Sequence, residues 1–505
     1  MTRRFRSGSS IAMLKPVRTF LLLVSALVSF PGCAATHREG LPPGSPFAET
    51  APVSADLLPQ GIAVGDVTNQ SALLWIRTNG PMTAQIEWAP VAVWERLSKK
   101  ETVVAPVART PLFTTGPESD FTLTIPLEGL TPATRYRLFV FAGSKGAEDT
   151  ATEARVAAHG EFTTLPEAAN STTVTFAWSG DLGGRGHCRR GAAGYPIFDV
   201  MGAQRLGFFL FLGDTMYADH LCPSPPNEPG ADFRATTLAE YRARHRDQRG
   251  AEALRRFLET TPVYVIWDDH EVGNDFSGPF DVRMPVGRQA LREYWPIRVA
   301  ADDVHRLYRA VRAGADLEMF ILDTRQYRSL NTDQDGPAKT MLGEKQLQWL
   351  LSGLTESTAT WKVIVTTVPL SIPKGGSASA PGNDGWAGGP GVPGFERERQ
   401  VIVDHILRRR IKNVVFLAGD VHHVQANAYD PNGDGIPDFH EFVAGPLSAP
   451  SDRLTPANVD LRPTMLINER GYMNFGLVRI TKSSFNVTVI DESGATRFSH
   501  RLFAK

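Results

Sequence analysis

Five apolar runs between residues 174 and 417 each end in a cluster of acidic or other polar residues. The runs are nearly continuous in apolar side chains, which is typical of strands that are buried on both faces of a sheet. In α/β proteins, functional sites lie at the carboxyl ends of parallel strands, so we expect the clusters to meet at one edge. The clusters are Trp178-Ser-Gly-Asp181, Leu212-Gly-Asp-Thr-Met-Tyr217, Trp267-Asp-Asp-His-Glu-Val-Gly-Asn274, Leu322-Asp-Thr-Arg325 and Leu417-Ala-Gly-Asp-Val-His-His423.

Buried strands alternate with helical patterns after Pro166, which predicts an α/β sandwich of two β layers with flanking helices. The later runs between Tyr472 and Phe503 could complete the second sheet. The expected strands are 174–178, 207–212, 263–267, 318–322, 361–365 and 413–417, and the expected helices are 238–258, 287–295, 343–354 and 397–410.

The preceding block, residues 61–164, has short β-rich runs separated by turn residues, which predicts a small β-sandwich. Its segment from Leu127 to Tyr136 resembles a corner of fibronectin type III domains. The block has no clustering of histidine, cysteine or carboxylate, so we expect it to serve in packing or recognition.

The N-terminus has the order of an export signal, because basic residues precede an apolar run over residues 20–30 that is too short to span a bilayer. Arg3-Arg4-Phe5 loosely resembles a twin-arginine signal. Cys33 stands where a lipoprotein carries its acylated cysteine, and ordinary cleavage near Ala34-Ala35 is the alternative. We expect an exported protein, periplasmic, at the cell surface or secreted. The predicted parts are an export signal (1–33), a Pro- and Gly-rich tether (34–59), the β-sandwich (60–166) and an α/β catalytic domain (170–505).

A net charge of −1, with 21% charged residues, gives no overall electrostatic field that would attract nucleic acid. Partners must therefore be argued from sites. We expect a small-molecule substrate, contact with a membrane only through a lipid anchor, and a monomer. The strand-end clusters offer carboxylates, imidazoles and a phenol. These ligands suit iron, manganese or calcium, and they differ from the thiolates of a cysteine-bound zinc site. One strand-end aspartate is usually a turn or cap residue. Five such clusters in one domain favour a metal site.

The order and the residues of these clusters resemble the sequence motifs of the calcineurin-like metallophosphoesterases, and in particular those of their PhoD-type branch. The matching segments are Gly213-Asp214, Trp267 to Glu271, Asp323 to Arg328 and Gly419 to His422. The resemblance covers about residues 173–475, and it implies a four-layer α/β/β/α sandwich behind the small β domain. It also implies hydrolysis of phosphate esters by a metal-activated hydroxide.

The resemblance implies two metal positions and a set of residues that act on the substrate. His270 would donate to the leaving oxygen, and Arg325 and Arg328 would clamp the phosphate, with surface pairing to Asp323 as the alternative for the arginines. The first metal, Fe³⁺ or else Mn²⁺ or Zn²⁺, would be held by Asp181, Asp214, Tyr217, Asp420 and His422, and the second, Ca²⁺, by Asp268, Asp269 and Asn274, with Asp214 bridging.

Two departures from the family bear on the metals. Asp181 stands where the family often has a cysteine, which weakens the assignment of iron. The segment from Val365 to Pro369 lacks a histidine that the wider superfamily uses, and this favours oxygen ligands and calcium at the second position.

The segment 430–441 fits the spacing of an EF-hand calcium loop, with Gly435 at the sharp turn. No flanking helices are expected, so a plain Asx and glycine turn is the alternative. The residues of this candidate structural calcium site are Asp430, Asn432, Asp434, Asp438 and Glu441.

Cys188 and Cys222 are the only cysteines left if Cys33 is lipidated or removed with the signal. They follow Asp181 and Asp214 by similar numbers of residues, so a disulfide would tie two loops of the site together. Two unpaired thiols on diverging loops remain the alternative.

Three functions compete at this level. The first is an alkaline phosphatase, and the second is a phosphodiesterase or phospholipase-like enzyme. The third, from another class, is an inactive surface-binding module in which the β domain does the work.

Overall fold

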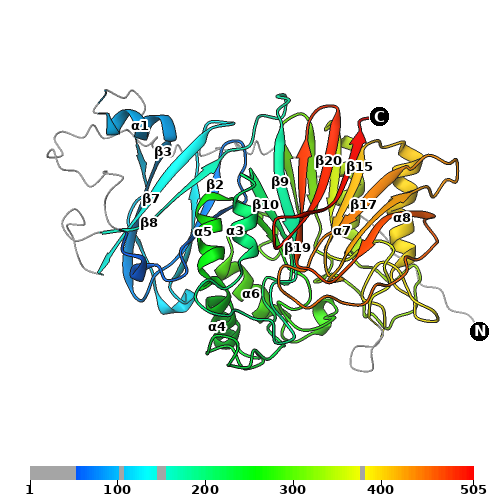
Figure 1. Ribbon diagram of the computed structural model, residues 1–505, viewed down its shortest axis with the longest axis horizontal. Helices are drawn as coiled ribbons and strands as arrows, with labels where there is room; N and C mark the ends of the chain where they lie inside the picture. The colour runs from blue at the N-terminus through cyan, green and yellow to red at the C-terminus, as the bar shows by residue number, and fades with distance from the viewer. Residues whose placement is uncertain (1–52, 100, 102–106, 145–154, 376–381) are drawn as a thin grey trace, which may run out of the picture. The chain divides into compact units, whose positions relative to one another are not determined.

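The computed structural model describes residues 53–99, 101, 107–144, 155–375 and 382–505 (Figure 1). The export signal, Cys33 and most of the tether lie outside the described residues. No helix in the described ranges is long and apolar enough to cross a membrane.

A nine-stranded sheet has the order β21-β20-β19-β9-β10-β11-β1-β2-β6. Its centre is formed by β9, β10 and β11, which run parallel. Strand β10 is buried along its whole length, and Phe176 of β9 stacks on Phe208 of β10 at 4.8 Å between ring centroids. The strands are β1 (Ile62–Gly65), β2 (Ala72–Arg77), β6 (Thr122–Leu127), β9 (Val174–Ser179), β10 (Phe208–Leu212), β11 (Val263–Ile266), β19 (Asn474–Ile480), β20 (Ser484–Asp491) and β21 (Thr496–Phe503).

A seven-stranded sheet has the order β12-β13-β14-β15-β17-β16-β18, with β13, β14 and β15 parallel at its centre. Apolar side chains of the two sheets, among them Leu210, Val363 and Leu417, belong to one buried core. The strands are β12 (Arg309–Ala313), β13 (Leu317–Ile321), β14 (Trp361–Val365), β15 (Val414–Ala418), β16 (Val424–Tyr429), β17 (Phe439–Val443) and β18 (Pro463–Glu469).

Helices cover the outer faces of both sheets (Figure 1). Leu254 and Phe257 of α5 join the core of the nine-stranded sheet, and Leu350 of α7 and Ile402 of α8 pack on the seven-stranded sheet. This arrangement is the predicted four-layer sandwich. The helices are α3 (Ile197–Gly202), α4 (Leu238–Arg249), α5 (Glu252–Thr260), α6 (Met284–Tyr294), α7 (Gly343–Glu356) and α8 (Glu396–Arg409), with short 3₁₀ turns at Ala55–Leu57, Pro117–Ser119 and Gly278–Phe280.

The N-terminal β-sandwich forms, but it is not separate from the catalytic fold. Its outer sheet packs through Ile86 and Leu138 on Ile62 and Ile76 of β1 and β2, and those strands continue the nine-stranded sheet because β1 pairs with β11. In the segment that resembles a fibronectin corner, the hydroxyl of Tyr136 accepts a hydrogen bond from Thr131 N at 2.8 Å. The outer sheet contains β3 (Met82–Pro90), β4 (Ala108–Arg109), β5 (Phe113–Thr114), β7 (Arg135–Ser144) and β8 (Arg155–Thr163), and α1 (Val91–Ser98) follows β3.

Two expectations about the elements were wrong. The single helix expected over residues 238–258 is two helices, α4 and α5, which are separated at Gly250 and Ala251. The strands between Tyr472 and Phe503 do not complete the second sheet, because β19 pairs antiparallel with β9 in the nine-stranded sheet.

Candidate metal centre

The polar clusters meet where the central parallel strands of both sheets end. Four of the expected ligands follow these strands with positive φ: Asp181 (63°), Asp214 (49°), Asp420 (71°) and His422 (53°). Left-handed backbone is uncommon for residues other than glycine and concentrates at functional sites. The strand ends therefore hold these side chains in sharp turns that direct them to a common point.

A first group of potential metal ligands contains Asp181, Asp214 and His422, whose donor atoms lie within 4.8 Å of one another. The hydroxyl of Tyr217 lies 2.9 Å from His422 Nε2. The other ring nitrogen, Nδ1, lies 2.9 Å from Pro450 O and can donate to it, which leaves Nε2 free to accept. Burial lowers the pKa of His422 to about 3, so the imidazole is neutral, as a metal ligand must be.

A second group contains Asp268, Asp269 and Asp420, again within 4.8 Å. Asp269 also belongs to a neighbouring group with Asp275 and Asp384. Neither Asp275 nor Asp384 was predicted from the sequence. Asp275 is next to the predicted ligand Asn274, and Asp384 lies in a glycine-rich stretch with no strand-end signal.

The expected ligand Asn274 lies next to Asp275, at the edge of the centre. Its residue is exposed, and its backbone N donates to Asp219 Oδ2. The adjacent Asp275 instead provides a carboxylate on the side of Asp269 and Asp384.

Five buried carboxylates of the centre each have one oxygen that accepts no hydrogen bond within the described chain: Asp181 Oδ2, Asp214 Oδ2, Asp268 Oδ2, Asp269 Oδ1 and Asp420 Oδ2. Leaving a buried charged acceptor without a partner is costly. Burial raises the pKa of Asp181 to about 7, and burial together with the charge of Asp269 raises that of Asp214 well above its usual range. These properties fit a site that is completed by cations.

Protein cations already compensate part of this charge. Arg325 donates from Nε to Asp268 Oδ1 at 2.6 Å and from both terminal nitrogens to the two oxygens of Asp384 at 2.7 Å. Arg328 donates to Asp384 and to the carbonyl of Thr324. Both arginines are buried, 0% and 1% exposed. Both guanidinium groups are therefore buried beside the carboxylates. They pair with Asp268 and Asp384, and not at the surface with Asp323.

A lysine that the sequence analysis did not single out completes this set of cations. Lys374 Nζ donates to Asp420 Oδ1 and, at 2.8 Å, to Asp420 O. Although burial opposes it, the carboxylate of Asp420 raises the pKa of Lys374 well above its usual value.

His270 lies beside the carboxylates and is oriented by Asp219. Its Nδ1 is 2.7 Å from Asp219 Oδ1, its Nε2 is 4.0 Å from Asp269 Oδ2, and its ring stacks on Tyr217 at 4.0 Å. Burial lowers its pKa, but Asp269 and Asp219 outweigh this effect and raise it to about 9. Asp219 is a further residue that sequence reasoning missed, although it follows Tyr217 by only two positions.

Two other polar residues hold the ligand loops in place. Glu271 is fully buried and accepts hydrogen bonds from the backbone N atoms of Asp214, Thr215 and Asp268, so it joins the loops after β10 and β11. Thr367, within the segment that lacks the superfamily's histidine, donates to Asp268 Oδ1 at 2.6 Å.

Family models match most of the described chain. The model described as PhoD-like phosphatase matches residues 178–489, and that of the PhoD-like phosphatase N-terminal domain matches residues 44–166. The chain belongs to the PhoD-like phosphatase family. A family of metallophosphatases implies metal ions, and the carboxylate and histidine groups above are suited to hold them.

Alkaline phosphatase D of Bacillus subtilis (strain 168) is 28% identical over 400 residues. The match covers 72% of this chain and 64% of that protein, so it spans slightly less than two thirds of the relative. A solved structure of PhoD has a TM-score of 0.71 at 23% identity and covers 90% of this chain and 92% of its own. Purple acid phosphatase PPD1 from yellow lupin (Lupinus luteus) seeds has a TM-score of 0.62 at 12% identity, covering 88% and 75%. These likenesses confirm the predicted fold class.

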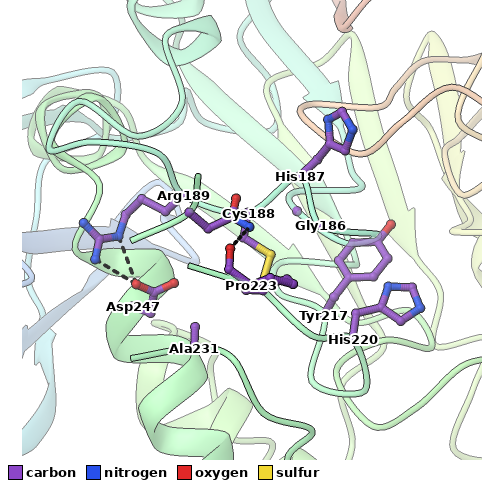
Figure 2. Close-up of a disulfide and its surroundings, with 12 residues drawn as sticks. Gly186, His187, Cys188, Arg189, Tyr217, His220, Pro223, Ala231 and Asp247 are labelled. Carbon is purple, nitrogen blue, oxygen red and sulfur yellow. Dashed lines mark hydrogen bonds and ion pairs between the residues drawn. A yellow bond between two sulfur atoms is a disulfide. The ribbon is translucent and has the colours of Figure 1, made fainter. Parts of the chain in front are cut away.

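A disulfide joins the two loops that follow Asp181 and Asp214 in this family member. Cys188 and Cys222 are bonded, with 5.8 Å between their Cα atoms and a sequence separation of 34. Figure 2 shows the bridge between the stretch that carries His187 and the stretch that carries Tyr217 and His220. Of the alternatives from sequence, the structure has the bridge.

The glycine-rich stretch before Cys188 lies against a predicted ligand. Gly184 has a φ of +88°, and a Cβ on it would come within 2.5 Å of the Tyr217 ring. A larger residue would therefore displace either this stretch or the ring, and the disulfide fixes both in their places.

The expected last ligand of the EF-hand-like segment is bonded within the fold and is not free to bind a cation in this structure. Glu441 lies in β17, fully buried, and its two oxygens accept from Leu370 N and from the hydroxyl of Tyr429, both at 2.6 Å. The oxygens of Asp430 accept from the backbone N atoms of Gly433 and Gly435, as in an Asx turn. The final ligand of the motif is therefore used in the core of the fold.

We predict that Asp275→Asn weakens binding of the second cation by about tenfold or more, because it removes a charge from the group with Asp269 and Asp384. Calorimetric titration of the metal-free full chain with Ca²⁺ measures this affinity. Asn274→Ala is the matched control and should bind as the parent does. Weaker binding in the control with normal binding in Asp275→Asn would contradict the placement.

We also predict that the double variant Cys188→Ser, Cys222→Ser loses about 3 to 4 kcal/mol of unfolding free energy, in line with the loop that the bridge closes. Urea denaturation of the oxidised parent and the variant gives this difference. The denatured, unreduced parent should show no reactive thiol at either position. Equal stability of the two proteins would be incompatible with a formed bridge.

Proposed function

We propose that this chain hydrolyses phosphate esters with two cations bound at the strand-end carboxylates. The observation that supports this most is the set of five buried aspartates that each keep one oxygen without a hydrogen bond. The family, and the alkaline phosphatase activity named for its relative in Bacillus subtilis, point to the same chemistry. An inactive binding module has no need for these uncompensated carboxylates.

The first cation would be held by Asp181, Asp214, His422 and Tyr217, and the second by Asp268, Asp269 and Asp420. This division differs from the expectation in two residues, since Asp420 groups with Asp268 and Asp269, and Asn274 is left out. The oxygen-rich donor set favours Ca²⁺ at the second position and Fe³⁺, Mn²⁺ or Zn²⁺ at the first. Bound there, cations would acidify a water molecule and stabilise charge on the phosphoryl oxygens.

The protein supplies positioning and a proton donor. Arg325 and Glu271 fix the carboxylates and the ligand loops, so the cluster needs little rearrangement during turnover. Asp219 holds His270 through Nδ1, which leaves Nε2 on the side of Asp269. We assign His270 the role of donor to the leaving oxygen.

We propose further that the enzyme acts outside the cytoplasm, as a monomer, on small phosphoesters. The disulfide supports export, because such bonds persist in oxidising compartments. Export by a twin-arginine signal and lipidation of Cys33 concern residues outside those described, and they stay predictions. A phosphodiesterase or phospholipase-like activity is the second candidate within the same chemistry.

Asp214→Asn is predicted to reduce turnover of 4-nitrophenyl phosphate by roughly a thousandfold or more. Asp214 groups with Asp181 and His422 and also with Asp269 and His270, so it lies between the two cation positions. Removal of metal by a chelator should abolish turnover, and Ca²⁺ should be needed to recover it. A matched assay with bis(4-nitrophenyl) phosphate compares monoester with diester. Full activity of metal-stripped protein would exclude the proposed mechanism.

His270→Ala should lower kcat by about 10²- to 10⁴-fold with a smaller effect on KM, because its contact strengthens in the transition state. Asp219→Asn should show a weaker effect in the same direction. Metal content should match that of the parent in both variants. If His270→Ala loses metal, the histidine is a ligand and the assignment as donor fails.

A further inference from the structure

A phosphoryl group at this centre needs a cation that solvent can reach. The predicted clamp is out of reach of solvent, because both arginines are fully buried. Three of the five N–H donors of Arg325 bond Asp268 and Asp384, and Arg328 is directed at Asp384 and backbone carbonyls. Moving either guanidinium to the substrate would also take a hydrogen-bond partner from the buried carboxylate of Asp384.

Lys374 lies at the boundary between the buried carboxylates and solvent. Its Nζ bonds two oxygens of Asp420, whose side chain is fully buried, whereas the lysine side chain itself is 21% exposed. An ammonium has three N–H donors. Among the described residues, the two contacts with Asp420 leave one of these donors for a further oxygen.

The backbone of Lys374 is fixed on the same side of the centre. Its carbonyl accepts from Asp384 N at 2.7 Å, and the adjacent Gly375 pairs with Asn383 in an antiparallel bridge. Asp384 is in turn held by Arg325 and Arg328. The backbone at Lys374 is therefore held next to the carboxylates that surround the second cation position.

One other exposed cation is close to the centre, on the side of His422. Arg185 is about half exposed, but its guanidinium forms a two-point ion pair with Asp452. That carboxylate already neutralises it, whereas the partner of Lys374 is a predicted metal ligand whose charge a bound cation would share.

We propose that Lys374 binds the phosphoryl group of the substrate directly and favours the dianion of a monoester over the monoanion of a diester. The inference rests on the phosphoester hydrolysis proposed above. The lysine takes the role that the sequence assigned to Arg325 and Arg328. With its remaining N–H donor, the ammonium would form a charge-assisted hydrogen bond to a phosphoryl oxygen while it stays bonded to Asp420.

The test compares Lys374→Met, which loses the charge, with Lys374→Arg, which keeps it. Lys362→Met is the matched control, because Lys362 is also partly buried and bonds a backbone carbonyl, Ala359 O, at the other end of β14. Calorimetry of the metal-loaded full chain measures the Kd of inorganic phosphate, and elemental analysis measures metal content. Turnover of 4-nitrophenyl phosphate and its bis-ester gives the monoester preference.

Lys374→Met should raise the Kd of phosphate by about tenfold or more and reduce kcat/KM for the monoester more than for the diester. Lys374→Arg should recover part of both, and Lys362→Met should match the parent. An unchanged Kd in Lys374→Met, or a Kd that rises only because metal is lost, would overturn the proposal. A parent that binds phosphate through Lys374 but turns over neither ester would reject the proposed hydrolysis and leave this binding site standing.

Discussion

The mutual repulsion of buried carboxylates at the strand ends is the constraint on which the centre depends. Asp181, Asp214, Asp268, Asp269 and Asp420 lie in overlapping groups of donor atoms within 4.8 Å. Like charges at such distances in a dry interior are strongly unfavourable without cations. Arg325 and Lys374 neutralise part of this negative charge. The carboxylate oxygens without a hydrogen bond indicate that further positive charge is needed.

The fold serves this constraint by bringing rigid strand ends together. Three parallel strands of each sheet end at the centre, and Glu271 joins two of their loops through backbone hydrogen bonds. The disulfide joins the loops after Asp181 and Asp214 further from the carboxylates. Because β1 continues the catalytic sheet, the N-terminal sandwich is built onto the same framework, and Thr50–Lys505 forms one compact unit.

Residues that follow a buried strand could be predicted from sequence, because the end of the apolar run marks the end of the strand and the polar residues that follow it. Asp181, Asp214 and Asp420 were found in this way. Asp384 and Lys374 could not be predicted in this way, because they lie in a loop whose sequence has no regular apolar pattern. Only the folded chain brings them close to Asp269. The burial of Arg325 and its pairing with Asp268 and Asp384 could not be predicted, because burial depends on the fold. The bonds of Glu441 within the core could not be predicted either, because a motif does not show which side chains the core uses.

The account is tested most directly by anomalous diffraction from crystals of the metal-loaded protein. It predicts two cation peaks, one bound by Asp181, Asp214 and His422 and the other by Asp269 and Asp420, close enough to share a bridging ligand. Metal bound only elsewhere, or five aspartates that remain without a cation in active protein, would contradict it.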